Sequence, residues 1–221
     1  EKTKAILPVH LYGQCANLDQ IIDIAHKHSL YVVEDTAQAI SADYTLADGS
    51  TKKAGTIGDI GCTSFFPSKN LGCFGDGGAM FTNDDDLASQ MRMIANHGMK
   101  VRYYHEVIGV NSRLDNLQAA VLRIKLRHLD EYREARNAVA AHYDLAFEGV
   151  SQLDTPERNP NSTHAFHQYT LKCKGIDRNA LRDYLAEHKI NLKTNTANSI
   201  VRWFGEKKPL SEFGKIKLGE I

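Results

Sequence analysis

The chain has 221 residues, of which 42% are hydrophobic and 24% are charged, the balance of an ordinary globular protein. Lysine and arginine number 27, as do aspartate and glutamate, so no net charge draws the chain to nucleic acid or to an anionic membrane. No apolar run approaches the roughly 18 residues that a membrane-spanning helix needs, and no cleavable signal pattern is present. The four cysteines are scattered and lack the spacing of a metal site. These features predict a cytoplasmic protein that binds neither nucleic acid nor membrane.

The first part of the chain predicts a strand, a helix and a second strand. Residues 4–11 form an apolar run, and a helix follows with Asn17 as its N-cap. Four apolar residues at helical spacing line one face of that helix: Leu18, Ile21, Ile22 and Ala25. Residues 30–33 are apolar without alternation, which is typical of a strand buried on both faces of a parallel sheet. Because the chain enters its first strand within a few residues of Glu1, we expect that N-terminal sequence is missing.

The rest of the pattern predicts an α/β protein with a smaller second domain. We place the domain boundary near residue 130, so that 1–130 belongs to a large domain and 131–221 forms a small α+β domain. The long helical stretch has an apolar stripe that we expect in the core: Leu117, Val121, Ile124 and Leu129. The further predicted elements are strands at 60–66 and 77–82, a helix at 84–96, a helix from 115 to about 147 bent near 129, a strand at 166–173 and a helix after Asp177.

Polar and glycine-rich segments follow the predicted strands, where ligands bind in open α/β sheets. An acidic residue, Asp35, ends one buried strand, and about thirty residues later Ser64 precedes Lys69 by five positions. Pyridoxal phosphate needs a carboxylate for its ring nitrogen, a lysine amine for its aldehyde, and hydroxyl groups with backbone amides for its phosphate. The order and spacing therefore point to this cofactor.

Each of these residues also has a simpler interpretation when it is taken alone. Asp35 can cap the end of a strand, Lys69 can be a surface lysine, and Ser64 can be a small residue inside a strand. The glycine-rich segment at 72–78 can be a tight turn. The residues alone leave these alternatives open.

A set of ordered motifs resembles the DegT/DnrJ/EryC1/StrS sugar aminotransferases. The similarity covers roughly residues 4–190 and is carried by the motifs at 8–14, 34–39, 64–72, 75–79, 97–98, 109–115, 118–122 and 167–169. It implies the α/β fold of type I pyridoxal-phosphate enzymes, with a mostly parallel mixed sheet, and a homodimer with shared active sites. The family's N-terminal phosphate loop is not matched, and the tail after about residue 190 departs from the family pattern.

The resemblance implies a role for each matching site residue. Lys69 is the lysine that binds pyridoxal phosphate covalently, and Asp35 pairs with the ring nitrogen. Gln38 lies against the ring, Ser64 binds the phosphate, and Asn111 reaches the phosphate of the neighbouring subunit.

Within the family, residues 60–69 and 102–105 are most similar to enzymes that aminate UDP-2-acetamido-2-deoxy-3-oxo-glucuronate. Such a substrate carries a carboxylate, for which Arg113 is a candidate bidentate partner, although a structural ion-pair role is an equal alternative. The implied activity is amino transfer from L-glutamate to a nucleotide-linked keto-sugar, for cell-surface polysaccharide such as O-antigen.

Several other functions remain as alternatives. Some relatives with histidine at the lysine position are sugar dehydratases, and Lys69 argues against that chemistry. The chain could also be an inactive, truncated fragment that only dimerises. A dinucleotide-binding domain and a metal hydrolase are weaker, because no GxGxxG follows the first strand and the histidines are dispersed.

Overall fold

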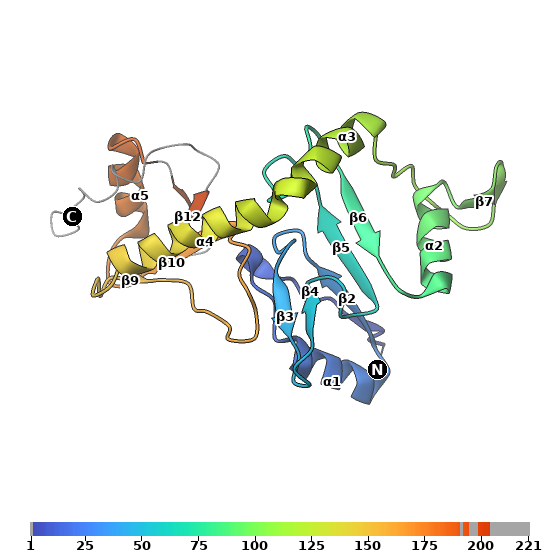
Figure 1. Ribbon diagram of the computed structural model, residues 1–221, viewed down its shortest axis with the longest axis horizontal. Helices are drawn as coiled ribbons and strands as arrows, with labels where there is room; N and C mark the ends of the chain where they lie inside the picture. The colour runs from blue at the N-terminus through green and yellow to red at the C-terminus, as the bar shows by residue number, and fades with distance from the viewer. Residues whose placement is uncertain (1, 191, 195–198, 204–221) are drawn as a thin grey trace.

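Two four-stranded sheets organise the chain. The structure is a computed structural model, and it describes residues 2–190, 192–194 and 199–203 (Figure 1). A long helix, α4 (Leu129–Ala146), leads from the region of the first sheet to the second sheet. The predicted domain boundary near residue 130 coincides with the start of this helix and stays a prediction.

The first sheet has the order β1-β2-β5-β6. Its strands are β1 (Ala5–Ile6), β2 (Tyr31–Asp35), β5 (Ile60–Ser64) and β6 (Gly78–Phe81). The pairings β1–β2 and β2–β5 are parallel, whereas β6 is antiparallel to β5. Helix α1 (Leu18–His28) connects β1 to β2, which confirms the predicted strand–helix–strand unit. The predicted first strand is shorter than expected, because a 3-10 turn, η1 (Leu11–Gly13), follows Pro8 and Val9.

The second sheet has the order β11-β12-β10-β9 and is antiparallel. Its strands are β9 (Leu153–Asp154), β10 (Gln168–Cys173), β11 (Lys193–Thr194) and β12 (Ser199–Trp203). Helix α5 (Arg178–Glu187) begins after Asp177, whose side chain accepts hydrogen bonds from the amides of Asn179 and Ala180. The predicted helix at this position is confirmed.

The remaining elements lie around the first sheet. They are the hairpin of β3 (Asp43–Thr45) and β4 (Thr51–Lys53), helix α2 (Asp85–Ala95), the hairpin of β7 (Met99–Val101) and β8 (Tyr104–His105), helix α3 (Asn116–Lys125) and the 3-10 turn η2 (Leu126–His128). The turn η2 separates α3 from α4, so the predicted bend in the long helical stretch is confirmed three residues earlier than expected. None of the helices in the described ranges is long and apolar enough to cross a membrane.

The prediction for the apolar stripe of α3 was wrong at two positions. Leu117 and Ile124 are 71% and 63% exposed, while Leu129 is buried. Leu122 is the buried residue of α3, and it packs with Phe65, Leu71 and Cys73 after β5. Helical spacing gave the period of the helix, but it did not show which face meets the sheet.

The segment before β10 packs into the core of the first sheet. Ala165 is fully buried and belongs to a cluster with Leu18 of α1, Ala39 and Tyr44. The next residue, Phe166, packs instead with Ala140 and Tyr143 of α4 and with Tyr169 of β10. A short stretch of chain therefore contacts the first sheet region on one side and the second on the other.

Candidate active site

Two neighbouring parallel strands bring the main candidate residues to one edge of the first sheet. Asp35 is the last residue of β2 and is paired in register with Cys62 of β5, and Ser64 ends β5 two residues later. Gln38 and Lys69 lie on the turns that directly follow these strands. All four side chains are half-buried, as expected for groups that line a ligand site at the carboxyl ends of parallel strands.

The backbone of Asp35 is fixed on both sides. Its amide donates to the carbonyl of Pro8 (2.9 Å), and its carbonyl accepts from the amide of His10 (3.0 Å). Carboxylate Oδ1 accepts the amide of Ala37 (2.9 Å), which orients the side chain at the end of the strand. The position of this negative charge is therefore set by the sheet and by the segment after β1.

The ammonium group of Lys69 lies in the field of Asp35. Burial lowers the pKa of Lys69, and the negative charge of Asp35 opposes this shift without cancelling it. A lowered pKa leaves more of the amine neutral, and the neutral amine is the nucleophile. The amide of Lys69 donates to the carbonyl of Phe66 (2.8 Å), so the lysine sits on a hydrogen-bonded turn.

Gln38 and Ser64 are each held by a backbone amide. The amide of Tyr12 donates to Gln38 Oε1 (2.7 Å), and Tyr12 adopts a left-handed conformation with φ of 62° within η1. The amide of Phe66 donates to Ser64 Oγ (3.2 Å), which leaves the hydroxyl hydrogen able to donate to an anion. The turn after β1 thus orients the amide group, and the turn after β5 orients the hydroxyl.

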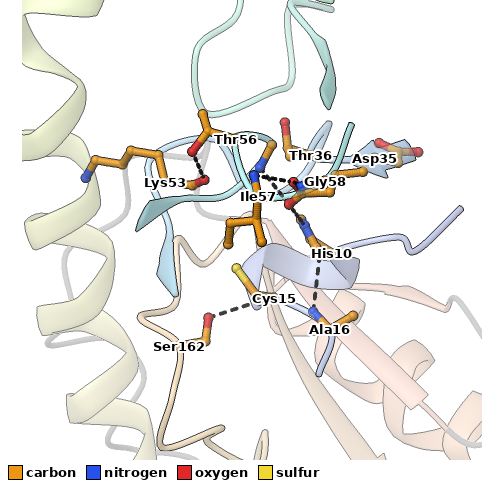
Figure 2. A network of polar contacts seen from close by, with 12 residues as sticks. His10, Cys15, Ala16, Asp35, Thr36, Lys53, Thr56, Ile57, Gly58 and Ser162 are labelled. Atoms are coloured by element: carbon orange, nitrogen blue, oxygen red, sulfur yellow. Dashed lines mark hydrogen bonds and ion pairs between the residues drawn. The ribbon is translucent and has the colours of Figure 1, made fainter. Parts of the chain in front are cut away.

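A hydrogen-bond network surrounds the buried side chains of Glu34, the neighbour of Asp35, and His10 (Figure 2). Glu34 accepts hydrogen bonds from the amides of Gly55, Ile57 and Gly58 (2.8, 2.7 and 2.6 Å) and from His10 Nε2 (2.9 Å). His10 Nδ1 accepts the amide of Ala16 (3.1 Å), so the imidazole proton is on Nε2. Burial alone raises the pKa of Glu34, but these four donors outweigh it and lower the pKa overall.

Sequence reasoning missed this network. The available signal was a glutamate that continues an apolar strand, since a buried carboxylate always requires partners. The partner His10 lies 24 residues away, and the amides come from a loop whose glycines, Gly55 and Gly58, are also ordinary turn residues. The position of Glu34 within an apolar strand indicates that its carboxylate needs hydrogen-bond donors, but it does not indicate which residues supply them.

Asn70, the neighbour of Lys69, was also missed. Its side chain is buried, and Nδ2 donates to the carbonyl of Ala165 (2.7 Å). Its Oδ1 lies 3.3 Å from His167 Nδ1. The turn that carries Lys69 is thereby attached to the segment before β10.

Asn111 and Arg113 lie apart from the other predicted site residues. Both are exposed on the segment between β8 and α3, where Arg113 Nε donates to Asn111 Oδ1 (3.1 Å) and Asn111 forms an isolated bridge with Asn96 after α2. Figure 1 shows this segment between α2 and α3. The structure brings Asp35, Gln38, Ser64 and Lys69 together and leaves Asn111 and Arg113 outside that group. In the described residues, no cluster of side chains is suited to a metal ion.

The sequence profile of the DegT/DnrJ/EryC1/StrS aminotransferase family matches residues 1–199. The chain belongs to this family. It is 50% identical over 171 residues to UDP-2-acetamido-2-deoxy-3-oxo-D-glucuronate aminotransferase of Pseudomonas aeruginosa, covering 77% of this chain and 46% of that protein. It is 49% identical over 192 residues to a protein named pleiotropic regulatory protein in Geobacillus stearothermophilus, covering 86% of this chain and 50% of the relative.

The solved structures agree with this assignment. The DesV structure of S. venezuelae, in complex with a ketimine intermediate, superposes with a TM-score of 0.81 at 43% identity. The match covers 87% of this chain and 50% of DesV. The fold is therefore that of the type I aminotransferases, as the resemblance implied. The chain spans about half the length of the relatives that it matches. Most of the divergent tail after residue 190 lies outside the described residues.

Enzymes of this family are dependent on pyridoxal phosphate, and the residues at the sheet edge fit that group. The ring nitrogen requires a carboxylate, which Asp35 provides, and the aldehyde requires an amine of lowered pKa, which Lys69 provides. The phosphate requires a hydroxyl that can donate its hydrogen, which Ser64 provides. The carboxylate and amine come from adjacent strand ends, close enough for their charges to interact.

Proposed function

We propose that this chain carries the lysine-bearing part of a pyridoxal-phosphate-dependent aminotransferase that acts on a nucleotide-linked keto-sugar. The observation that carries the proposal is the placement of Asp35 at the end of β2 and of Lys69 on the turn that follows the neighbouring parallel strand β5, where Asp35 influences the pKa of the lysine. The substrate we favour is a UDP-linked 3-keto-N-acetylhexosaminuronate, which is supported by the 50% identity to the Pseudomonas enzyme. We further propose L-glutamate as the amino donor, a cytoplasmic homodimer with shared sites, and a role in surface polysaccharide synthesis.

When bound, pyridoxal phosphate supplies an electron sink for the carbon that gains or loses a proton. Asp35 would hold a proton on the ring nitrogen, because an adjacent carboxylate raises the pKa of a pyridine. Ser64 would donate its hydroxyl hydrogen to the phosphate, and Gln38 would lie against the ring. Lys69 would bind the aldehyde and, once displaced by the substrate amine, would move the proton at the substrate carbon.

Asn111 and Arg113 would act at positions away from this group. We propose that Asn111 reaches the phosphate in the neighbouring subunit, which is consistent with its exposure on a segment remote from Lys69. Arg113 would bind the carboxylate of the sugar, since a guanidinium can form two parallel hydrogen bonds with a carboxylate. Its contact with Asn111 leaves its terminal nitrogens for such a ligand.

Covalent trapping tests the role of Lys69. The intact protein is mixed with pyridoxal phosphate, treated with borohydride and digested, and the modified peptide is located by mass spectrometry. We expect a near-visible absorption band and a modified Lys69, both lost in Lys69→Ala and both kept in Lys27→Ala, a matched change at an exposed lysine of α1. Absence of the band and of any modification in the unaltered protein would refute the proposed function.

Substrate competition tests the role of Arg113. The keto-uronate nucleotide is compared with the same nucleotide sugar lacking the carboxylate, in the unaltered protein and in Arg113→Ala. We expect the preference for the uronate to disappear in the variant. Arg127→Ala, at an exposed arginine of η2, is the control. An unchanged preference combined with weaker cofactor binding would show instead that Arg113 serves to hold Asn111.

A further inference from the structure

The strongest unassigned cluster surrounds Asn70. This residue follows Lys69 directly, is 7% exposed, and uses both ends of its amide group. Nδ2 donates to the carbonyl of Ala165, and Oδ1 faces His167 Nδ1. Asn70 and His167 are 97 residues apart in sequence, so this contact closes a long loop between the lysine turn and the start of β10.

The hydrogen bonds define the protonation of His167. A carbonyl oxygen only accepts, so the atom of Asn70 that meets Ala165 is the nitrogen, and the atom that meets His167 is the oxygen. The proton of the contact must therefore be carried by His167 Nδ1. The nitrogen and the oxygen of the Asn70 amide are therefore distinguished by their hydrogen-bond partners, because the two atoms have nearly the same shape.

His167 is also uncharged at neutral pH. Burial lowers the pKa of His167 to about 4, and the positive charges of Lys69 and Arg136 act in the same direction. Asn70, the residue after Lys69, contacts this imidazole, so the lysine turn lies against the ring. A neutral, buried ring against the lysine turn excludes water without adding a second charge.

A second attachment joins the same segment to the turn that orients Gln38. The amide of Ala165 donates to the carbonyl of Gly13 (2.7 Å). Gly13 has φ of 115°, and a Cβ there would lie 2.7 Å from the amide nitrogen of Phe166 and 2.9 Å from that of His167. The absence of a side chain at Gly13 therefore permits the approach. Residues 165–167 thus contact the turn that carries Lys69 and the turn that orients Gln38.

We propose that Asn70 and His167 form a clamp through which the segment before β10 positions Lys69 for reaction with the cofactor aldehyde. This inference rests on the proposed function. Asn70 and His167 are positioning residues, because they act through the turn that carries Lys69. The clamp keeps the Lys69 amine desolvated and fixes its direction relative to Asp35.

The test measures how fast the intact protein forms the reducible bond with pyridoxal phosphate at saturating concentration, as a function of pH. In His167→Ala and in Asn70→Ala we expect the rate to fall by about tenfold or more, because small displacements of a reacting group cost at least that much. We also expect the half-maximal pH to move upward, since water admitted beside Lys69 raises its pKa toward the ordinary value.

His167→Asn and Cys173→Ala separate positioning from general stability. An asparagine amide nitrogen takes roughly the place of His Nδ1, so His167→Asn should recover most of the rate and the original pH profile. Cys173 is buried at the far end of β10, the strand that follows His167, and Cys173→Ala should lower the melting temperature without changing the rate or its pH profile.

The outcomes distinguish this inference from the proposed function. If His167→Ala and Asn70→Ala lower the melting temperature but keep the rate and pH profile of the unaltered protein, the clamp is structural only and the inference is wrong. If the unaltered protein forms no bond that depends on Lys69, the proposed function fails and the inference fails with it.

Discussion

Replacing Glu34 with glutamine tests the buried network behind Asp35. The carboxylate is fully buried, and each of its oxygens accepts two hydrogen bonds: Oε1 from Ile57 and Gly58, Oε2 from His10 and Gly55. Glutamine has nearly the same shape but replaces one oxygen with an NH2 group, which cannot accept. Two donors then lose their acceptor whichever way the amide turns.

His10 cannot relieve this conflict without creating another. If its proton moved to Nδ1, Nε2 could accept from the new NH2 group, but Nδ1 would then face the amide of Ala16 as a second donor. At least two donors therefore remain unsatisfied in either tautomer. At about 1–3 kcal/mol for each donor, the expected loss is about 4 kcal/mol. That is a large part of the roughly 5–15 kcal/mol that stabilises a domain.

Urea unfolding followed by far-UV circular dichroism measures the loss, with Glu187→Gln as the control because Glu187 is exposed on α5. Hydrogen exchange of the peptide covering residues 53–58 localises it, since three of its amides lose or weaken their acceptor. The reasoning is refuted if Glu34→Gln lies within about 0.5 kcal/mol of the control, the range of ordinary surface changes.

Two further predictions concern the segment before β10. Burial lowers the pKa of His164 to about 3 and that of His167 to about 4, from 6.5 in the unfolded chain, so the unfolded chain binds more protons in acid. The two histidines should therefore not change the free energy of unfolding above about pH 6.5. Below that pH, down to about pH 4, each should lower it by about 1.4 kcal/mol per pH unit. Unfolding titrations at several pH values measure this slope, and an unchanged slope in the double variant His164→Gln plus His167→Gln would contradict the prediction. Gly13→Ala should lose about 2 kcal/mol or more, because its Cβ would meet backbone atoms. Gly49→Ala has a similar positive φ and open space around it, so equal losses in the two variants would remove the close approach as the cause.

The proximity of Asp35 and Ser64 was predictable because local rules determine it. A run of apolar residues predicts a buried parallel strand, and parallel strands present their carboxyl ends at one edge. Asp35 and Ser64 directly end such runs, so their proximity followed from the order of the strands. Lys69 followed from its short distance in sequence to Ser64, and its position in the field of Asp35 agrees with that expectation.

The supporting contacts were not predictable, because they join residues with no local relation. His10 and Glu34 are 24 residues apart, and Asn70 and His167 are 97 residues apart. The same limit explains the error at Leu117 and Ile124: the period of a helix predicts a stripe, but the stripe that becomes buried depends on which neighbour the helix meets.

The candidate residues at the sheet edge and those on the segment before α3 also differ in how many of their contacts come from this chain. Hydrogen bonds within the chain hold the side chains of Asp35, Gln38 and Ser64 and the backbone of Lys69, so these proposed cofactor residues are positioned before any partner binds. Asn111 and Arg113 contact each other on an exposed segment. The ligand proposed for Asn111 comes from the neighbouring subunit, and the ligand proposed for Arg113 comes from the substrate. Variants in the first group should therefore change cofactor binding at any protein concentration, whereas the effect of Asn111→Ala should disappear on dilution to monomers.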